Sequence, residues 1–184
     1  MRVIAGKARG HKLKKVPGDA TRPITDRVKE NLFNILGDWV QGTRWLDLFA
    51  GTGQVGIEAL SRGATTVVFV DKARPAIKTI QFNLQHTHLF DGAEVLNLDA
   101  FDYLRREGIT PYDVIFIAPP QYYELWSKVL LTLDQRLGDY LSAQGMVIVQ
   151  IDPKEYKEQK LKSLVLFDER RYGNTLLCFY EGED

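Results

Sequence analysis

Cysteine is almost missing from this sequence, and long apolar runs are missing altogether. Cys178 is the only cysteine among 184 residues, which excludes an internal disulfide and a cysteine-rich metal site. We expect it to pack within a late strand. No apolar run approaches the roughly 20 residues needed to cross a bilayer, and no apolar signal segment follows the basic N-terminal residues. The sequence therefore predicts a cytoplasmic protein without membrane contact, and we expect a monomer.

Histidine is scarce as well. Only three histidines occur, and two of them, His86 and His88, flank Thr87. Two imidazoles without a nearby cysteine or carboxylate cluster make a poor metal site. We therefore predict that both are surface residues at a helix end and that the chain binds no metal.

Acidic side chains are absent from the first sixteen residues, although the whole chain has a net charge of zero. Residues 1–30 hold nine Lys and Arg against three acids, whereas the remaining 154 residues hold 15 basic and 21 acidic side chains. A basic block on an acidic domain is typical of a phosphate-binding arm, although a solvated hairpin that binds nothing has the same charge. The basic residues predicted to contact phosphates are Arg2, Lys7, Arg9, Lys12, Lys14, Lys15, Arg22 and Arg27.

Apolar periodicity predicts alternating strands and helices after a first helix capped by Thr25 and ended by Gly37. Strands are expected at 44–49, 66–70, 94–98, 112–117 and 146–151, with helices at 55–61, 73–85, 101–106 and 123–131. Repeated β-α units of this length imply an α/β fold whose parallel sheet is covered on both faces and holds its ligand at the carboxyl ends of the strands.

Both ends of the chain predict hairpins. The runs 2–5 and 11–16 are strand-like around residues 6–10, and the runs 164–171 and 175–180 are joined by a turn at 172–174. We therefore divide the chain into a basic N-terminal β-hairpin arm, residues 1–20, and a main domain, residues 21–184, which ends in an antiparallel hairpin.

Glycines follow the first strand of the main domain at positions 51, 53 and 56, where they let the backbone approach a ligand. With Asp71 at the end of the next strand, this spacing also matches an NAD-binding enzyme. Asp47 lies four residues before Gly51, where a carboxylate would repel a pyrophosphate and attract an ammonium or sulfonium group. The pattern therefore favours S-adenosylmethionine over NAD.

Two further carboxylates fit the same ligand. Asp71 could hold a ribose diol, and Asp99 with Ala100 could meet an adenine amine. Both aspartates precede helices, so a helix cap is the competing role. We favour ligand contact because Asp47, Asp71 and Asp99 stand at three successive strand ends that meet in one crevice.

Two longer segments resemble a known family. Residues 22–36, which begin Arg-Pro-Ile-Thr-Asp-Arg-Val, and residues 47–64, which continue the glycine motif through Gly-Ile-Glu-Ala-Leu-Ser-Arg-Gly-Ala, look like the bacterial RsmD-type 16S rRNA guanine-N2 methyltransferases. The similarity covers nearly the whole chain. It implies a class I methyltransferase fold with a Rossmann-like seven-stranded sheet and S-adenosylmethionine as donor. The acceptor would be one guanine amine of 16S rRNA, free or in an assembling small subunit.

The resemblance also implies roles for particular residues. Asp47, Gly51 and Gly53 would contact the methionine end, and residues 22–34 would line the cofactor and RNA side. The full set of expected cofactor contacts is Asp47, Phe49, Ala50, Gly51, Thr52, Gly53, Gly56, Asp71, Lys72, Asp99 and Ala100.

One segment departs from the family pattern. Where the family reads Asp-Pro-Pro followed by an aromatic residue, this chain reads Ala118-Pro119-Pro120-Gln121-Tyr122. An acceptor helps to localise the lone pair of the guanine amine, and an alanine side chain accepts nothing. Stiff backbone carbonyls at 118 and 119 and the amide of Gln121 could take its place, and Tyr122 or Tyr123 could stack on the base. The five residues 118–122 are the predicted catalytic segment.

Three functional classes remain open from the sequence. The leading hypothesis is a guanine-N2 rRNA methyltransferase. A second is a DNA amino-methyltransferase, although no target-recognition domain is evident. The third is a catalytically impaired relative that binds rRNA and cofactor without transfer, because Ala118 replaces the usual aspartate.

Overall fold

The computed structural model describes residues 1–18 and 23–183, and its strands form one seven-stranded sheet in the order β3-β2-β1-β4-β5-β7-β6. The strands are β1 (Arg44–Leu48), β2 (Thr66–Asp71), β3 (Ala93–Asn97), β4 (Tyr112–Ile117), β5 (Leu141–Ile151), β6 (Leu164–Tyr172) and β7 (Thr175–Gly182). The helices are α1 (Asp26–Leu36), α2 (Gln54–Ser61), α3 (Arg74–Thr87), α4 (Ala100–Tyr103), α5 (Leu125–Asp134) and α6 (Leu137–Tyr140). Short 3-10 turns are η1 (Gly37–Val40), η2 (Phe90–Gly92) and η3 (Pro153–Glu155).

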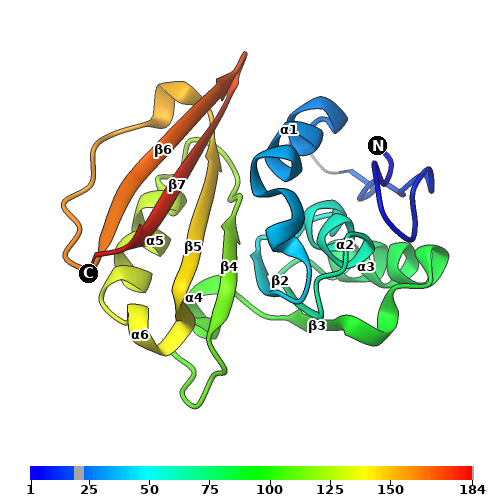
Figure 1. Ribbon diagram of the computed structural model, residues 1–184, viewed down its shortest axis with the longest axis horizontal. Helices are drawn as coiled ribbons and strands as arrows, with labels where there is room; N and C mark the ends of the chain where they lie inside the picture. Colours follow the sequence, from blue (N-terminus) through cyan, green and yellow to red (C-terminus); the bar gives the residue numbers. More distant parts are fainter. Residues whose placement is uncertain (19–22, 184) are drawn as a thin grey trace.

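The first five strands run parallel, and the sheet separates two apolar layers. Helices α1, α2 and α3 cover one face, where Leu32, Ile57 and Ile80 are fully buried (Figure 1). Helices α4, α5 and α6 cover the other face with Tyr103, Val129 and Tyr140. The carboxyl ends of the parallel strands therefore meet at one edge, as the β-α alternation predicts.

Helix α1 begins and ends where the sequence predicts. The hydroxyl of Thr25 accepts a hydrogen bond from the Val28 N–H at 3.3 Å, and Gly37 follows the last turn. Val28, Leu32 and Leu36 are buried on one face. A capped end and one apolar stripe together fix this short helix against the sheet.

The C-terminal hairpin is confirmed. Strand β7 pairs antiparallel with both β5 and β6, so the last part of the chain closes the sheet beyond β5. Cys178 lies in β7 and is fully buried, as expected, and burial raises the pKa of its thiol to about 12.

The N-terminal arm is less regular than expected. The chain doubles back in antiparallel fashion, but the predicted strands 2–5 and 11–16 reduce to a single bridge between Arg2 and Lys12 among the residues described. Gly6 and Gly10 both have positive φ, and the N–H groups of Ile4 and Ala5 bond to a side chain of α2 instead of a second strand. Three backbone hydrogen bonds still join the two halves of the arm, from the N–H groups of Val3, Gly10 and Leu13. The arm is therefore a short hairpin that is also bonded to α2.

Several other boundaries differ from the sequence prediction, three of them by three residues or more. Helix α4 ends at Tyr103 rather than at residue 106, α5 runs on to Asp134, and β5 starts at Leu141 rather than at 146. Ser142 bonds to Asp113 of β4 at 2.8 Å, which extends the pairing over a polar stretch. In the described part of the chain, no helix combines the length and apolar character that a membrane span needs.

Candidate functional site

The glycine loop between β1 and α2 has an unusual backbone. Phe49, Gly51 and Gly53 all have positive φ, and Gly53 directly precedes α2. A positive φ is rare for a residue with a side chain, so Phe49 is held in place by its neighbours. The Ala50 N–H donates to Val70 of β2, and the Ala50 carbonyl accepts from Gly53 at 2.7 Å. The loop is thus fixed at the carboxyl end of the sheet.

Gly56 allows α2 to lie directly on β2. A Cβ at this position would stand 2.3 Å from a ring carbon of Phe69 and 2.7 Å from a methyl of Val67. Since real carbon atoms do not approach so closely, only glycine permits this packing. The close contact directs the N-terminus of α2 toward the loop.

Asp47 lies under the loop, in β1, and is 2% exposed. Its Oδ2 accepts a hydrogen bond from the Gly56 N–H at 3.3 Å. Burial raises the pKa of this carboxyl to about 8, with a smaller contribution from Asp71, against the lowering effect of the Gly56 bond. The sequence suggested a carboxylate at this position, and burial favours its protonated form.

Asp71 and Asp99 both bond to the backbone. Asp71, the last residue of β2, accepts from the N–H groups of Gly51 at 2.9 Å and Ala73 at 2.8 Å. Asp99 caps α4 by accepting from Phe101 at 2.8 Å. A carboxylate has about four acceptor positions, so these bonds leave capacity for a ligand. Lys72 is exposed and Ala100 is buried.

The glycine loop and the proline segment leave the sheet side by side. Strands β1 and β4 are parallel neighbours, and Leu48 is paired with Ile117. The residues after Leu48 form the glycine loop, and the residues after Ile117 are Ala118, Pro119 and Pro120. Two segments that the sequence singled out independently therefore adjoin at one edge of the sheet.

Both the backbone N–H and the hydroxyl of Tyr122 form hydrogen bonds. Its N–H donates to Glu155 at 2.6 Å, and its hydroxyl donates to Asp152 at 2.9 Å. Its φ is positive, and 65% of the residue remains exposed. Tyr123 is 68% exposed beside it. Sequence reasoning missed Asp152 and Glu155, because their link to Tyr122 spans about thirty residues and carries no local pattern.

Gln150 was missed as well. Its Oε1 is shielded from solvent and accepts no hydrogen bond; the only comparable side-chain atom in the described ranges is Oε2 of Glu155. Both residues lie at or just beyond the carboxyl end of β5, next to the proline segment. Buried acceptors are normally satisfied, so two such atoms at one place require an explanation.

A buried ion pair anchors the arm. Nζ of Lys29 lies 3.5 Å from Glu58, and both side chains are fully buried. Glu58 also accepts from the N–H groups of Ile4 at 2.9 Å and Ala5 at 3.0 Å, and Lys29 donates to the Arg2 carbonyl at 2.6 Å. Burial lowers the pKa of Lys29, whereas Glu58 and Asp26 oppose that shift. The helices α1 and α2 thus hold the arm through its backbone.

Asn83 of α3 connects the arm to the glycine loop. Its side chain is fully buried, accepts from the Lys14 N–H at 2.8 Å and donates to the Lys14 carbonyl at 3.1 Å. The same amide donates to the Thr52 carbonyl at 3.0 Å. One side chain therefore contacts both the basic arm and the predicted cofactor loop.

The predicted RNA-contacting residues are exposed on and beside the arm. Arg2, Arg9 and Arg27 line a hollow of about 430 Å³ together with Asp26 and Glu30. Lys7, Lys12, Lys14 and Lys15 are exposed along the arm, which is drawn in blue in Figure 1. Arg22 lies outside the described residues. The structure thus gathers the described members of this predicted set on the side of α1, α2 and α3.

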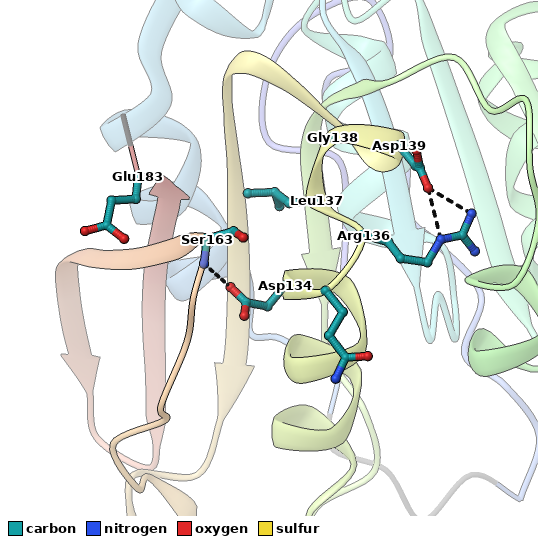
Figure 2. A pocket seen from close by; sticks show the side chains of 8 residues that line it. Asp134, Arg136, Leu137, Gly138, Asp139, Ser163 and Glu183 are labelled. Carbon is teal, nitrogen blue, oxygen red and sulfur yellow. Dashed lines mark hydrogen bonds and ion pairs between the residues drawn. The ribbon is translucent and has the colours of Figure 1, made fainter.

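A second hollow, of about 420 Å³, lies near the start of β5 and the end of α5 (Figure 2). Asp134 borders it and accepts from the N–H groups of Lys162, Ser163 and Leu164, each at 2.8 Å. Those bonds fix the chain before β6 and account for this buried carboxylate. Among the described residues, no group of three or more potential metal ligands occurs, including around His86 and His88, which are exposed.

Comparison with known proteins shows relatives along the whole chain. The family model described as conserved hypothetical protein 95 matches residues 1–181. The YlbH protein of Bacillus subtilis (strain 168) is 41% identical over 187 residues, covering 98% of each chain. Ribosomal RNA small subunit methyltransferase D of Haemophilus influenzae is 33% identical over 183 residues, covering 95% of this chain and 94% of the relative.

Solved structures show the same fold. The yhhF protein of Escherichia coli has a TM-score of 0.86 at 31% identity, covering 100% of this chain and 98% of that one. A more distant chain, crystallised with SAH, has a TM-score of 0.65 at 21% identity and shares only the fold. The predicted class I methyltransferase architecture is confirmed. The chain belongs to the family described as conserved hypothetical protein 95, together with the RsmD-type ribosomal RNA small subunit methyltransferases.

Proposed function

We propose that this chain transfers a methyl group from S-adenosylmethionine to the N2 amine of a guanine in small-subunit rRNA. The observation that carries the proposal is the pairing of Leu48 with Ile117, which sets the glycine loop beside the proline segment. A methyl donor held by the glycine loop would face an amine held by the proline segment. Relatives named as small-subunit rRNA methyltransferases support the RNA substrate.

The residues around the glycine loop fit the donor. Positive φ angles at Phe49, Gly51 and Gly53 expose backbone at the start of α2, and Asp71 retains acceptor capacity for a ribose diol. Asp47 would be ionised by a nearby cation, because an opposite charge lowers a raised carboxyl pKa. When bound, S-adenosylmethionine supplies an electrophilic methyl on a sulfonium. The loop and its carboxyl groups bind and orient that group.

The chain's own contribution to transfer is alignment and exclusion of water. The prolines at 119 and 120 limit the backbone that follows β4, and the bonds of Tyr122 to Asp152 and Glu155 fix its far end. A base that enters beside Tyr122 and Tyr123 can stack on an exposed ring. Correct alignment of amine and methyl can supply several kcal/mol of the barrier reduction.

Methyl transfer from labelled S-adenosylmethionine to unmodified 16S rRNA and to small subunits tests the proposal. The mark would be located by mass spectrometry, with duplex DNA as a parallel substrate. Label on a guanine N2 is the expected result. Label on DNA alone would favour an amino-methyltransferase of DNA. Cofactor binding without any transfer, together with activity in Ala118→Asp, would mean that the chain binds its ligands but has lost the reaction.

A further inference from the structure

The end of β5 can supply the acceptor that residue 118 lacks. An exocyclic amine is a poor nucleophile because its lone pair is delocalised into the ring, so an oxygen that binds its N–H assists transfer. The side chain of Ala118 cannot do this, and Ala118 packs partly buried against the α1–α3 layer. Any side-chain acceptor must therefore come from a neighbouring element.

Strand β5 is that neighbour, and its register identifies one residue. Ile117 of β4 pairs with Val149 of β5, so the next residues of the two strands, Ala118 and Gln150, stand side by side. Phe116 and Ile148 belong to the α1–α3 layer, whereas Ile117 and Val149 belong to the opposite layer. Because side chains alternate along a strand, Gln150 faces the same side as Ala118.

The side chain of Gln150 also has an unused acceptor. Its Oε1 is buried and accepts no hydrogen bond from the residues described. A buried carbonyl oxygen without a donor costs about 1–3 kcal/mol, and such groups are often explained by function. An amine bound beside Ala118 would be the missing donor.

The other nearby carboxylates both bind Tyr122, although Oε2 of Glu155 has no partner among the described residues. Glu155 uses one oxygen for the Tyr122 N–H at 2.6 Å, and Asp152 accepts the Tyr122 hydroxyl. Asp152 and Glu155 therefore orient Tyr122. Gln150 does not share this role. Gln150 lies beside Ala118, faces the same side of the sheet and has a side-chain oxygen without a hydrogen bond. Within the described segment from Ala118 to Tyr122 and the end of β5, no other residue combines these three properties.

We propose that Gln150 is the side chain that accepts a hydrogen bond from the acceptor amine, and this inference rests on the proposed function. The amine lone pair forms the new N–C bond, the C–S electron pair returns to sulfur, and the nitrogen loses one proton to water. Gln150 takes no proton, because an amide oxygen is not a base. It orients the amine so that the nitrogen lone pair is no longer delocalised into the ring and points toward the methyl carbon.

The first test compares Gln150→Leu, which removes the acceptor, with Gln150→Glu, which keeps one. With 16S rRNA as substrate, kcat of Gln150→Leu is expected to fall about 10- to 100-fold, while KM for RNA stays within about twofold because phosphate contacts set affinity. Gln150→Glu should retain at least about a third of the parent rate. Gln135→Leu, at an exposed glutamine that lines the hollow near the end of α5, is the matched control.

Rescue provides a second test. Ala118→Asp restores a carboxylate on the neighbouring strand, so adding it to Gln150→Leu should recover at least about tenfold of the lost rate. A purely structural role for Gln150 predicts no recovery. Thermal melting of each variant shows whether a loss of rate follows a loss of folding.

A binding measurement makes the test independent of turnover. GMP and IMP differ only in the N2 amine, and each would be titrated into the SAH-loaded protein while NMR follows the Gln150 side-chain amide. The parent chain should bind GMP about three- to tenfold more tightly than IMP, and Gln150→Leu should bind both equally. Equal binding by the parent, or an unchanged preference in the variant, overturns the proposal. If the parent transfers no methyl group to rRNA, the proposed function fails, and the GMP preference still decides the role of Gln150.

Discussion

Lys29 and Glu58 form an ion pair 3.5 Å apart in which neither side chain reaches solvent. The pair joins α1 to α2, and each partner also bonds to the backbone of the arm. Such a pair is costly to break because the remaining charge stays buried. The arm is therefore fixed to the domain through a buried ion pair that is costly to break.

Replacing Glu58 should loosen the arm. Glu58→Gln keeps the shape but leaves Lys29 without a counter-charge, so we expect a loss of about 3 kcal/mol in the free energy of unfolding. Hydrogen exchange at the Ile4 and Ala5 amides should also accelerate. Urea denaturation and exchange followed by mass spectrometry measure both effects. Asp102→Asn breaks the exposed pair with Arg105 and should cost less than about 1 kcal/mol; equal losses would refute the anchoring role.

Replacing Asn83 should affect the arm and the glycine loop together. Asn83→Ala removes the bonds to Lys14 and Thr52, so faster exchange at the Lys14 amide should accompany weaker binding of SAH. We expect an affinity loss of about fivefold, since one buried bond to a loop carbonyl is worth about 1 kcal/mol. Calorimetry supplies the affinity. Asn174→Ala, in the exposed turn of the C-terminal hairpin, is the control, and normal SAH affinity in Asn83→Ala would contradict the link.

Asp47 should make stability depend on pH. Its pKa is raised by burial to about 8 in the folded chain, from an ordinary 3.8. A group whose pKa is raised by folding stabilises the fold while it keeps its proton. That contribution is complete below about pH 4 and is lost as the pH rises toward about 8. Asp47→Asn cannot ionise, so it should exceed the parent in stability by roughly 5 kcal/mol near pH 8.5, and by less near pH 5.

Urea denaturation at several pH values measures this difference. Asp91→Asn, at an exposed position in η2, serves as the control and should show no such trend. A constant difference between Asp47→Asn and the parent across the range would mean that Asp47 is ionised in the folded chain.

The lysines of the arm should control rRNA affinity and its salt dependence. Neutralising Lys12, Lys14 and Lys15 to Gln is expected to lower the slope of log affinity against log salt by about one for each phosphate that the arm no longer neutralises. Filter binding to 16S rRNA between low and physiological salt measures the slope. The matched triple change at Lys157, Lys160 and Lys162, all exposed after β5, should leave it unaltered. An equal effect in both triples would rule out a dedicated arm.

The sequence predicted the parallel strands well because each is a short apolar run between turn residues. Strand β4 has the predicted bounds, and the helix signals at Thr25 and Gly37 were read correctly. The first half of β5 was not predicted, since Ser-Ala-Gln-Gly has no strand pattern. It is joined to β4 through the pairing of Leu141 with Tyr112. The arm resembled two strands, but its halves share only a few backbone bonds. Its other partners include Glu58, Ser61 and Asn83 on helices.

The sequence predicts those parts of the candidate site that have a local pattern, but not those that depend on the surrounding structure. Glycines and acidic residues after strands have a local pattern, so the loop near Asp47, Asp71 and Asp99 could be located from the sequence. The protonation of Asp47 depends on burial by distant segments. The unused oxygen of Gln150 likewise depends on which side chains fail to reach it. Neither property is encoded within a few residues of the site.

Under the proposed function, Gly6 affects how fast the arm would bind RNA. A Cβ there would stand 1.9 Å from the carbonyl oxygen of Ser61, so the arm and α2 meet backbone to backbone. An arm seated in this way has its shape before any RNA arrives. Its encounter with phosphates then requires no prior folding step, and association should approach the rate set by diffusion and charge attraction.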